Sequence, residues 1–359
     1  MFESTLISKK VYLLGFGLSL FLSLAITKIL ITVLSRIKFL QKFSKEGSVN
    51  SSKKVLPFGG VAVVLSFLIT LWVFLYAGIV DSKNIYLFQV ISLGFTLMFL
   101  LGIYDDLVEG SLGIKITIQV AIALSLYYFG FHVEKIGDWT ILKYFSLFFV
   151  VFWIMGITNS ANLIDGEDGL AGGIFLLACL TLFLFYLNRG AFEASLLSII
   201  IAGSILGFLI FNLPPAKIIL GDSGSLPIGL LASLISLLPY IQGFTDEIYL
   251  VVPIVVLMVP IVDTWLAFFR RIVNGKNPFS KDKKHVHHRL IRLGLSPMQS
   301  VSILLTIGLY FDLISLLPIL YIDLVPNFVP YFFIFIMINI AVMLSLLGDF
   351  EEKTLRRKE

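Results

Sequence analysis

Cysteine is almost absent from this sequence, and charged side chains are scarce. The 359 residues include a single cysteine, Cys179, which excludes a disulfide framework and a zinc site built from cysteine ligands. Asp, Glu, Lys and Arg together make up 14% of the residues, whereas soluble domains contain about 25%. The net charge of +4 is small and scattered, so the composition gives no indication of nucleic-acid binding.

Apolar residues are abundant instead. They make up 58% of the chain, and soluble domains contain about 45–50%. A soluble core cannot bury this excess. We therefore predict an all-α polytopic membrane protein.

Runs of mostly apolar residues recur along the chain at the length that a helix needs to cross a bilayer, about 20 residues. They predict about eleven transmembrane helices, at residues 11–35, 58–80, 85–104, 114–132, 141–163, 169–187, 191–212, 224–241, 248–269, 299–320 and 326–348.

Lysine and arginine are distributed unequally between the two sides of the predicted bundle. Twenty of the 27 fall on one side, six fall on the other, and Lys28 lies inside the first span. The positive-inside rule therefore places the richer side in the cytoplasm, with the N-terminus outside and the C-terminus cytoplasmic. The cytoplasmic loops are then those near residues 36–57, 105–113, 164–168, 213–223 and 270–298.

Four polar clusters lie in the predicted cytoplasmic loops, and the loops on the other side contain no counterpart. They span residues 105–119, 162–169, 212–225 and 285–289. Each cluster alone has a structural interpretation, because charged residues mark helix ends and Asp-Gly pairs form turns. Asp105 and Asp106 repel one another at the end of an apolar helix, so one of them needs a cation or must lose its charge. We interpret Asp263 and Asp312, which lie inside spans, as structural residues.

The four clusters together indicate chemistry on phosphate groups. Carboxylates and an asparagine amide are hard oxygen ligands, which suit Mg²⁺ or Mn²⁺. Lysine, arginine and histidine beside them supply positive charge and donors for phosphate oxygens. The pattern therefore predicts a metal-assisted reaction of a phosphorylated substrate, in an active site at the cytoplasmic face.

At these residues the sequence resembles the polyprenyl-phosphate N-acetylhexosamine-1-phosphate transferase superfamily over about residues 57–290. The matching motifs are Asp105-Asp106 with Lys115 and Gln119, Asn-Leu-Ile-Asp-Gly-x-Asp-Gly-Leu at 162–170, Phe-Asn-x-x-Pro-Ala-Lys and Gly-Asp-Ser-Gly-Ser at 211–225, and His-x-His-His-Arg-Leu at 285–290. The last string resembles the WecA/TagO branch, because the MraY branch usually has three contiguous histidines followed by Leu-Glu.

The resemblance implies an enzyme, an undecaprenyl-phosphate N-acetylglucosaminyl-1-phosphate transferase. It would use Mg²⁺ (or Mn²⁺) to transfer N-acetylglucosamine-1-phosphate from UDP-N-acetylglucosamine to undecaprenyl phosphate, which gives undecaprenyl-diphospho-N-acetylglucosamine and UMP. This would be the first membrane step of cell-envelope glycopolymer synthesis, in cell wall biogenesis, for teichoic acid, lipopolysaccharide or a related polymer; which of these polymers it serves stays open. The implied protein is a single integral-membrane transferase domain over residues 1–359, in the bacterial inner (cytoplasmic) membrane, surrounded by membrane lipids. No motif here shows the homodimer known in the superfamily, and the exact N-acetylhexosamine stays open.

The resemblance also implies roles for individual residues. The metal ligands are Asp222, as the principal one, and Asn162. The catalytic residues are Asp105, Asp106, Lys115 and Asp165. The substrate-binding residues are Asp168, Asn212, Lys217, His285, His287, His288 and Arg289.

In this assignment the two carboxylates of Asp105 and Asp106 orient or deprotonate the lipid phosphate, and Lys115 neutralises phosphate charge. The uracil lies against Asp168 and Asn212, while the histidines and Arg289 hold the diphosphate and the sugar. An anionic phosphate must attack an anionic diphosphate, so charge neutralisation is the main task. We favour direct attack on the sugar-linked phosphorus. A covalent aspartyl-phosphate route stays open.

The sequence departs from the superfamily pattern at three places. Ile219 stands where many relatives have Phe, and Pro57-Phe58-Gly59-Gly60 lacks the basic residue of a similar element. Glu167 occupies a position that is usually aliphatic. None of these residues is an implied metal ligand.

Three other functions compete with this interpretation. The first is an MraY-like phospho-N-acetylmuramoyl-pentapeptide transferase. The second is an intramembrane aspartyl protease, because Tyr104-Asp105 and Gly221-Asp222 resemble its paired aspartates, although the histidine segment would then have no purpose. An ion-coupled transporter is the third, but it would place acids near the middle of the bilayer rather than at the ends of spans.

Overall fold

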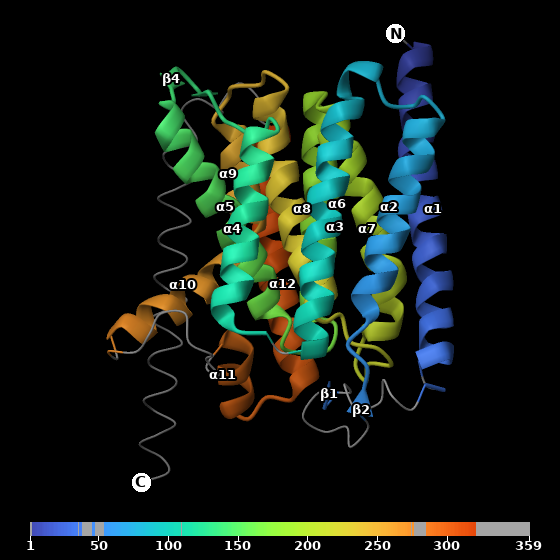
Figure 1. The fold of residues 1–359 in the computed structure, drawn as a ribbon, viewed down its shortest axis with the longest axis vertical. Coiled ribbons are helices and arrows are strands. Elements are labelled where there is room, and N and C mark those ends of the chain that lie inside the picture. The colour runs from blue at the N-terminus through green and yellow to red at the C-terminus, as the bar shows by residue number, and fades with distance from the viewer. Residues whose placement is uncertain are drawn as a thin grey trace.

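The computed structural model describes residues 2–34, 36–37, 45–46, 54–108, 110–273, 275 and 285–320. Over these ranges the chain forms a bundle of long helices that stand side by side (Figure 1). The long helices are α1 (Phe2–Leu34), α2 (Gly59–Tyr76), α3 (Ile85–Val108), α4 (Leu112–Tyr128), α5 (Lys143–Ile164), α6 (Leu170–Arg189), α7 (Phe192–Asn212), α8 (Asp222–Ile241), α10 (Met258–Val273) and α12 (Pro297–Ser315).

The remaining elements are short. They are the helices α9 (Ile248–Val256), α11 (Val286–Arg292) and α13 (Leu317–Leu320), the 3₁₀ turn η2 (Ser82–Asn84), and the strands β1 (Lys45–Glu46), β2 (Lys54–Val55), β3 (Lys135–Ile136) and β4 (Trp139–Thr140). The strands pair antiparallel in two hairpins, β1 with β2 and β3 with β4.

Within the described residues, eight helices are long and apolar enough to cross a membrane, and the number is nine if a bent pair counts as one span. The protein is therefore a multi-pass helical membrane protein, as predicted. The predicted number of eleven spans is not confirmed within the described residues. The fourth predicted span is α4, which is only 17 residues long, and the eleventh (326–348) lies outside the described residues.

The ninth predicted span (248–269) is not one straight helix. Helices α9 and α10 meet at Leu257 with a bend of 72°. Pro260 explains the break, because proline has no N–H to donate to the carbonyl of Val256 and its ring collides with that carbonyl in a continuous helix. As a result α10 leaves the bundle sideways (Figure 1).

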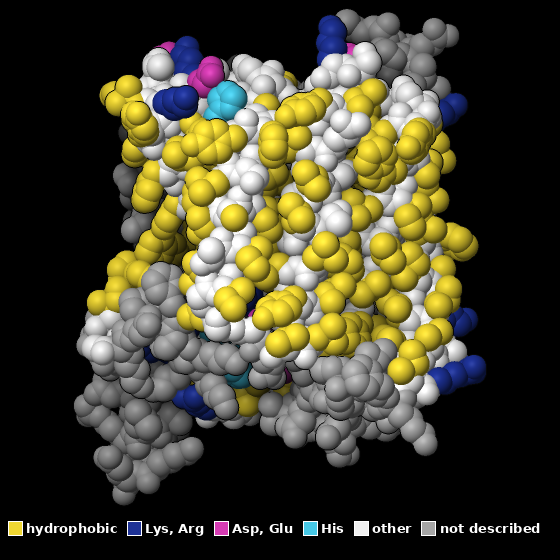
Figure 2. All heavy atoms as spheres, viewed as in Figure 1, with side chains coloured by type: hydrophobic (Ala, Val, Ile, Leu, Met, Phe, Trp, Pro, Cys, Tyr) yellow, Lys and Arg dark blue, Asp and Glu magenta, His cyan; other side chains and the backbone are white. Residues whose placement is uncertain are grey.

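The core of the bundle is α8. Almost all of its residues are buried, because it packs against α2, α3, α5 and α7. In α1, by contrast, only 22% of the apolar membrane-spanning segment is buried. On the face shown in Figure 2, a broad band of apolar side chains covers the bundle, with charged side chains near both ends. This is the surface expected of a bundle that faces lipid.

Two glycines let helix backbones touch at one end of the bundle. A Cβ on Gly102 of α3 would collide with the backbone of Asp222 and Ser223, and a Cβ on Gly60 of α2 would collide with the backbone of Gly224. Small residues permit such close approach between membrane helices. The first turn of α8 is therefore fixed directly against α2 and α3.

Candidate active site

A half-buried lysine donates to three side-chain oxygens at this end of the bundle. Lys115 Nζ, from α4, lies 2.9 Å from Asp105 Oδ2 of α3 and 3.3 Å from Asn162 Oδ1 of α5. It also donates to Asp222 Oδ2 in the first turn of α8. The side chains of Lys115, Asp105 and Asp222 are 12%, 18% and 19% exposed. Four helices thus bring four sequence-predicted residues to one point.

The donor set of this cluster suits a divalent cation. Two carboxylates and one amide offer oxygen atoms, which Mg²⁺ prefers. All three oxygens converge on a single positively charged atom, the ammonium of Lys115, so the cluster already holds a cation. Asn162 is further oriented by Ser225 of α8, whose Oγ accepts a hydrogen bond from Asn162 Nδ2 at 3.1 Å. Ser225 was not singled out from the sequence as a site residue, and only its place in the Gly-Asp-Ser-Gly-Ser motif pointed to it.

Asp106, the neighbour of Asp105, holds the start of α8. Its two carboxylate oxygens accept hydrogen bonds from the backbone N–H groups of Asp222 and Ser223, at 3.1 and 3.0 Å. A negative charge at a helix N-terminus is favourable, and these N–H groups would otherwise be unpaired. Gly221, with φ +73°, leaves the space that this carboxylate fills. Asp106 therefore positions Asp222.

We expect Asp106→Ala to lower the free energy of unfolding by about 1–3 kcal/mol, because it leaves two buried N–H groups unpaired. Turnover should fall as well, since the first turn of α8 carries Asp222. The melting temperature in detergent and the rate of product release measure both effects. Asp81→Ala is the matched control, because the Asp81 side chain also accepts from a backbone N–H but on an exposed turn. Equal losses in the two variants would contradict this role for Asp106.

Two further predicted residues join the turn at 165–169 to the segment at 213–221. Asp168 Oδ2 accepts from the backbone N–H of Ala216 at 3.0 Å. Asn212 accepts from the backbone N–H of Gly169 at 3.0 Å and donates to the carbonyl of Ile218 at 2.9 Å. Both side chains are buried. They set the relative positions of two loops, and a contact of theirs with a base remains a prediction.

The segment around Pro57 lies beside the first turn of α8. The backbone N–H groups of Gly59 and Gly60 donate to the carbonyls of Ile219 and Leu220, and the N–H of Ile219 donates to the carbonyl of Leu56, at 2.9–3.1 Å. The Gly59-Gly60 pair was the sequence signal for this contact. The first predicted cytoplasmic loop thus reaches the site through its backbone.

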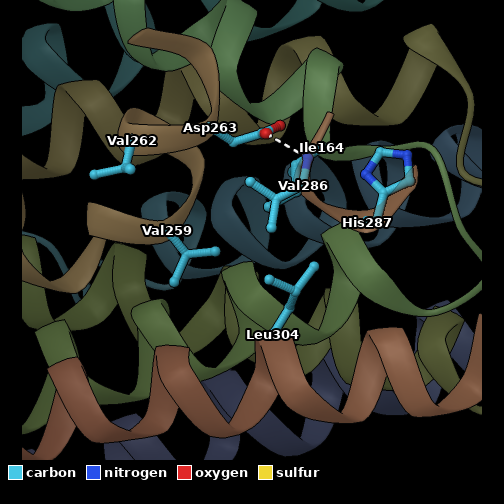
Figure 3. Close-up of a pocket in the computed structure, with 7 residues that line it drawn as sticks. All are labelled: Ile164, Val259, Val262, Asp263, Val286, His287 and Leu304. Atoms are coloured by element: carbon cyan, nitrogen blue, oxygen red, sulfur yellow. Dashed lines mark hydrogen bonds between the residues drawn. The ribbon is translucent and has the colours of Figure 1, made fainter. Parts of the chain in front are cut away.

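The histidine segment is anchored by an acid from α10. Asp263 Oδ2 lies 2.9 Å from His285 Nδ1, and Asp263 Oδ1 accepts from the backbone N–H of Val286 at 2.8 Å. Figure 3 shows the hydrogen bond between Asp263 of α10 and Val286 of α11, with His287 next to Val286 on α11. The structural interpretation of Asp263 is confirmed, because it fixes where α11 begins.

His287 and Glu167 are buried where α11 meets the turn at 165–169. Burial, together with His288, lowers the pKa of His287 to about 3, so its ring is neutral. Burial, together with Asp168, raises the pKa of Glu167 to about 7. A Cβ on Gly166 would collide with His287 Nε2, so the turn has no room for a side chain there. The histidine segment and the turn are therefore in direct contact.

The raised pKa of Glu167 predicts a pH dependence of stability. The carboxyl binds its proton more tightly in the folded chain than in the unfolded chain, where the pKa is near 4.5. Stability should therefore fall as pH rises from about 4.5 to about 7 and then level off. In melting curves recorded with chelator, wild type should lose stability relative to Glu167→Leu across this range. Glu134→Leu, an exposed control, should follow wild type, and parallel curves for wild type and Glu167→Leu would refute the expectation.

The structure thus gathers the predicted residues into two adjoining groups. Asp105, Asn162 and Asp222 surround Lys115, and the histidines contact the turn that follows Asn162. Asp165 is the half-buried residue that ends α5, and His288 and Arg289 are half-buried on α11, while Lys217 is exposed. The catalytic, substrate-binding and metal-binding roles of all these residues stay predictions.

Comparison with known proteins agrees with this geometry. Residues 88–240 match the family model of glycosyl transferase family 4. The chain is 36% identical to a probable undecaprenyl-phosphate N-acetylglucosaminyl 1-phosphate transferase of Bacillus subtilis, over 72% of each chain. It is 30% identical to an undecaprenyl-phosphate alpha-N-acetylglucosaminyl 1-phosphate transferase of Thermotoga maritima, over 82% of this chain and 87% of that protein. It is also 28% identical to a phospho-N-acetylmuramoyl-pentapeptide-transferase of Anoxybacillus flavithermus, over 86% and 98%.

The helical bundle is that of a multi-pass membrane protein, and the carboxylates around Lys115 form a charged cluster that suits phosphate chemistry. With these relatives, the chain belongs to glycosyl transferase family 4. The predicted resemblance to the polyprenyl-phosphate transferases is confirmed, and so is the predicted enzyme class, a glycosyl-1-phosphate transferase.

Proposed function

We propose that this enzyme transfers N-acetylglucosamine-1-phosphate from UDP-N-acetylglucosamine to undecaprenyl phosphate, with Mg²⁺ as cofactor and UMP as the second product. The observation that carries the proposal is the convergence of Asp105, Asn162 and Asp222 on Lys115. The names of two relatives specify this sugar phosphate and this lipid.

The chemistry matches the charges at the site. Asp222 and Asn162, with Asp105 beside them, would hold Mg²⁺, which when bound neutralises diphosphate charge. Lys115 then has its ammonium close to the phosphates and reduces the repulsion between the two anionic substrates. Asp105 orients the lipid phosphate. Asp106 holds the first turn of α8 and so keeps Asp222 in place.

The transfer itself needs no atom from the protein. An oxygen of the lipid phosphate forms a bond to the sugar-linked phosphorus, and the bond from that phosphorus to the bridging oxygen breaks. UMP leaves with the bridging oxygen. The site must bring the two reactants together and stabilise the charge, and direct attack is therefore the route we favour over an aspartyl-phosphate.

We also propose that this end of the bundle faces the cytoplasm, in the cytoplasmic membrane of a bacterium. The four polar clusters and α11 lie at the end opposite to the N-terminus (Figure 1). The loops and the C-terminal tail that the sequence assigns to this side hold twenty of the 27 lysines and arginines, which the positive-inside rule associates with the cytoplasm. A donor made in the cytoplasm would then reach the site directly. Residues 1–359 are proposed to act as one domain.

The donor sugar is what separates the proposal from its main alternative. A relative named for transfer of phospho-N-acetylmuramoyl-pentapeptide matches over 86% of the chain at 28% identity. We favour N-acetylglucosamine because the relative named for it is 36% identical and because Val286 interrupts the histidine run.

A donor comparison tests the proposal. Purified protein is supplied with undecaprenyl phosphate and Mg²⁺, with either UDP-N-acetylglucosamine or UDP-N-acetylmuramoyl-pentapeptide, and UMP release is measured. We expect release with the first donor only, and complete loss of it with EDTA. Release with the pentapeptide donor alone would assign the protein to the alternative. Release unaffected by EDTA would refute the metal dependence.

A further inference from the structure

A second group of metal-ligating side chains lies where α11 meets the turn at 165–169. Glu167, His287 and His288 each offer one ligand atom, and the three atoms lie within 4.8 Å of one another. None of these residues belongs to the cluster around Lys115. The function proposed above, on which this inference does not depend, uses Mg²⁺ at that other cluster. The resemblance implies a substrate-binding role for His287 and His288 but gives none to Glu167, which lies beside them.

Two atoms of this group are buried and unpartnered. Glu167 is 7% exposed and His287 is 1% exposed. Glu167 Oε2 and His287 Nε2 form no hydrogen bond with any described residue. A buried polar atom without a partner costs about 1–3 kcal/mol. Two such atoms on neighbouring members of one group therefore indicate a ligand that satisfies them.

The chemistry of the three donor atoms indicates which metal ion would bind. Two imidazole nitrogens and one carboxylate oxygen are typical of Zn²⁺ and similar transition metals, whereas Mg²⁺ prefers oxygen atoms alone. In a tetrahedral zinc site with bonds of about 2.1 Å the donors are about 3.4 Å apart. Side-chain rotations that bring the donor atoms closer by up to about 1.4 Å would complete the site. Three protein ligands leave the fourth position for water or another oxygen ligand.

The surroundings hold the ligands in place. Asp263 binds His285 and the backbone N–H of Val286, so the start of α11 is fixed before any metal binds. The rings of His287 and His288 lie 4.2 Å apart between centroids. Gly166 has no side chain to block His287 Nε2. These contacts preorganise the site, which lowers the entropic cost of binding an ion.

We propose that Glu167, His287 and His288 bind one divalent transition-metal ion of the Zn²⁺ type, which fastens α11 to the turn at 165–169. The site depends on Glu167, at a position where the superfamily usually has an aliphatic residue. The proposed ion is therefore a feature of this chain and not a requirement of the superfamily reaction.

The test uses Co²⁺ as a spectroscopic substitute for Zn²⁺. Full-length protein, purified without a polyhistidine tag and stripped with chelator, is titrated with Co²⁺ in the presence of excess Mg²⁺. Wild type should develop the intense visible absorption of low-coordinate Co²⁺, saturating at one ion per chain, and one equivalent of Zn²⁺ should abolish it. Glu167→Leu and Glu167→Gln should both lose the absorption. Asp222→Asn should keep it, which separates this site from the Mg²⁺ site.

The fourth histidine of the chain supplies the matched control. His132 lies 3.3 Å from Glu134 at the other end of the bundle, so His132→Gln removes a comparable pair and should leave the absorption unchanged. Zn²⁺ should also raise the melting temperature of wild type and not that of Glu167→Leu. The proposal is overturned if wild type gives no such absorption, if both Glu167 variants retain it, or if Zn²⁺ stabilises wild type and Glu167→Leu equally.

Discussion

Asp222→Asn should reduce UMP release by at least about 100-fold, the cost of removing one main electrostatic contribution to a transition state. Asp222 is the residue of α8 whose carboxylate contacts Lys115, and its backbone N–H is held by Asp106. The substitution keeps the shape of the side chain and removes its charge. The loss should therefore appear in kcat rather than in folding.

Melting curves and a control variant of another aspartate distinguish a loss of catalysis from a loss of folding. Asp138→Asn removes an exposed carboxylate at the opposite end of the bundle and should leave turnover unchanged. Asp222→Asn should melt within a few degrees of wild type. Full activity in Asp222→Asn would contradict the assignment, and so would an equal loss in Asp138→Asn.

Lys115→Met should reduce both turnover and stability. Without the ammonium, the carboxylates of Asp105 and Asp222 face one another with no shared cation. Breaking a fully buried ion pair costs about 3–5 kcal/mol, and the partial exposure of these side chains reduces the expected loss to about 1–3 kcal/mol. Turnover should fall by about 10²–10³-fold, because Lys115 is the cation next to the phosphates.

Added Mg²⁺ sharpens this prediction. In Lys115→Met the ammonium no longer occupies the oxygens of Asp105, Asn162 and Asp222, so these oxygens should bind Mg²⁺ more tightly. Mg²⁺ should therefore raise the melting temperature of Lys115→Met more than that of wild type. Lys135→Met, an exposed control at the other end of the bundle, should behave as wild type does. If Mg²⁺ had the same effect on all three proteins, the three oxygens around Lys115 would not be a cation site.

Much of the fold could be predicted because the bilayer imposes the length of its helices. The ten predicted spans between residues 11 and 320 all fall on helices. The break at Leu257 was missed, although Pro260 was the signal for it. Hydropathy averages over about 20 residues and therefore does not register a single lost backbone hydrogen bond.

The site could be predicted as a set of residues but not as a set of contacts. The sequence assigns the carboxylates of Asp105 and Asp106 one shared role, but the side chains of successive helical residues point about 100° apart. One therefore meets Lys115, and the other meets α8. The approach of Glu167 to His287 depends on how two distant segments pack, which no local pattern records.

The most direct test of the central claim follows the β-phosphate of the donor. UDP-N-acetylglucosamine labelled with ³²P at the sugar-linked phosphorus is incubated with protein, Mg²⁺ and undecaprenyl phosphate, and the products are separated into lipid and aqueous fractions. We predict that the label moves into the lipid fraction while unlabelled UMP is released in equal amount. Labelled UDP in the aqueous fraction, with unlabelled sugar on the lipid, would contradict the account.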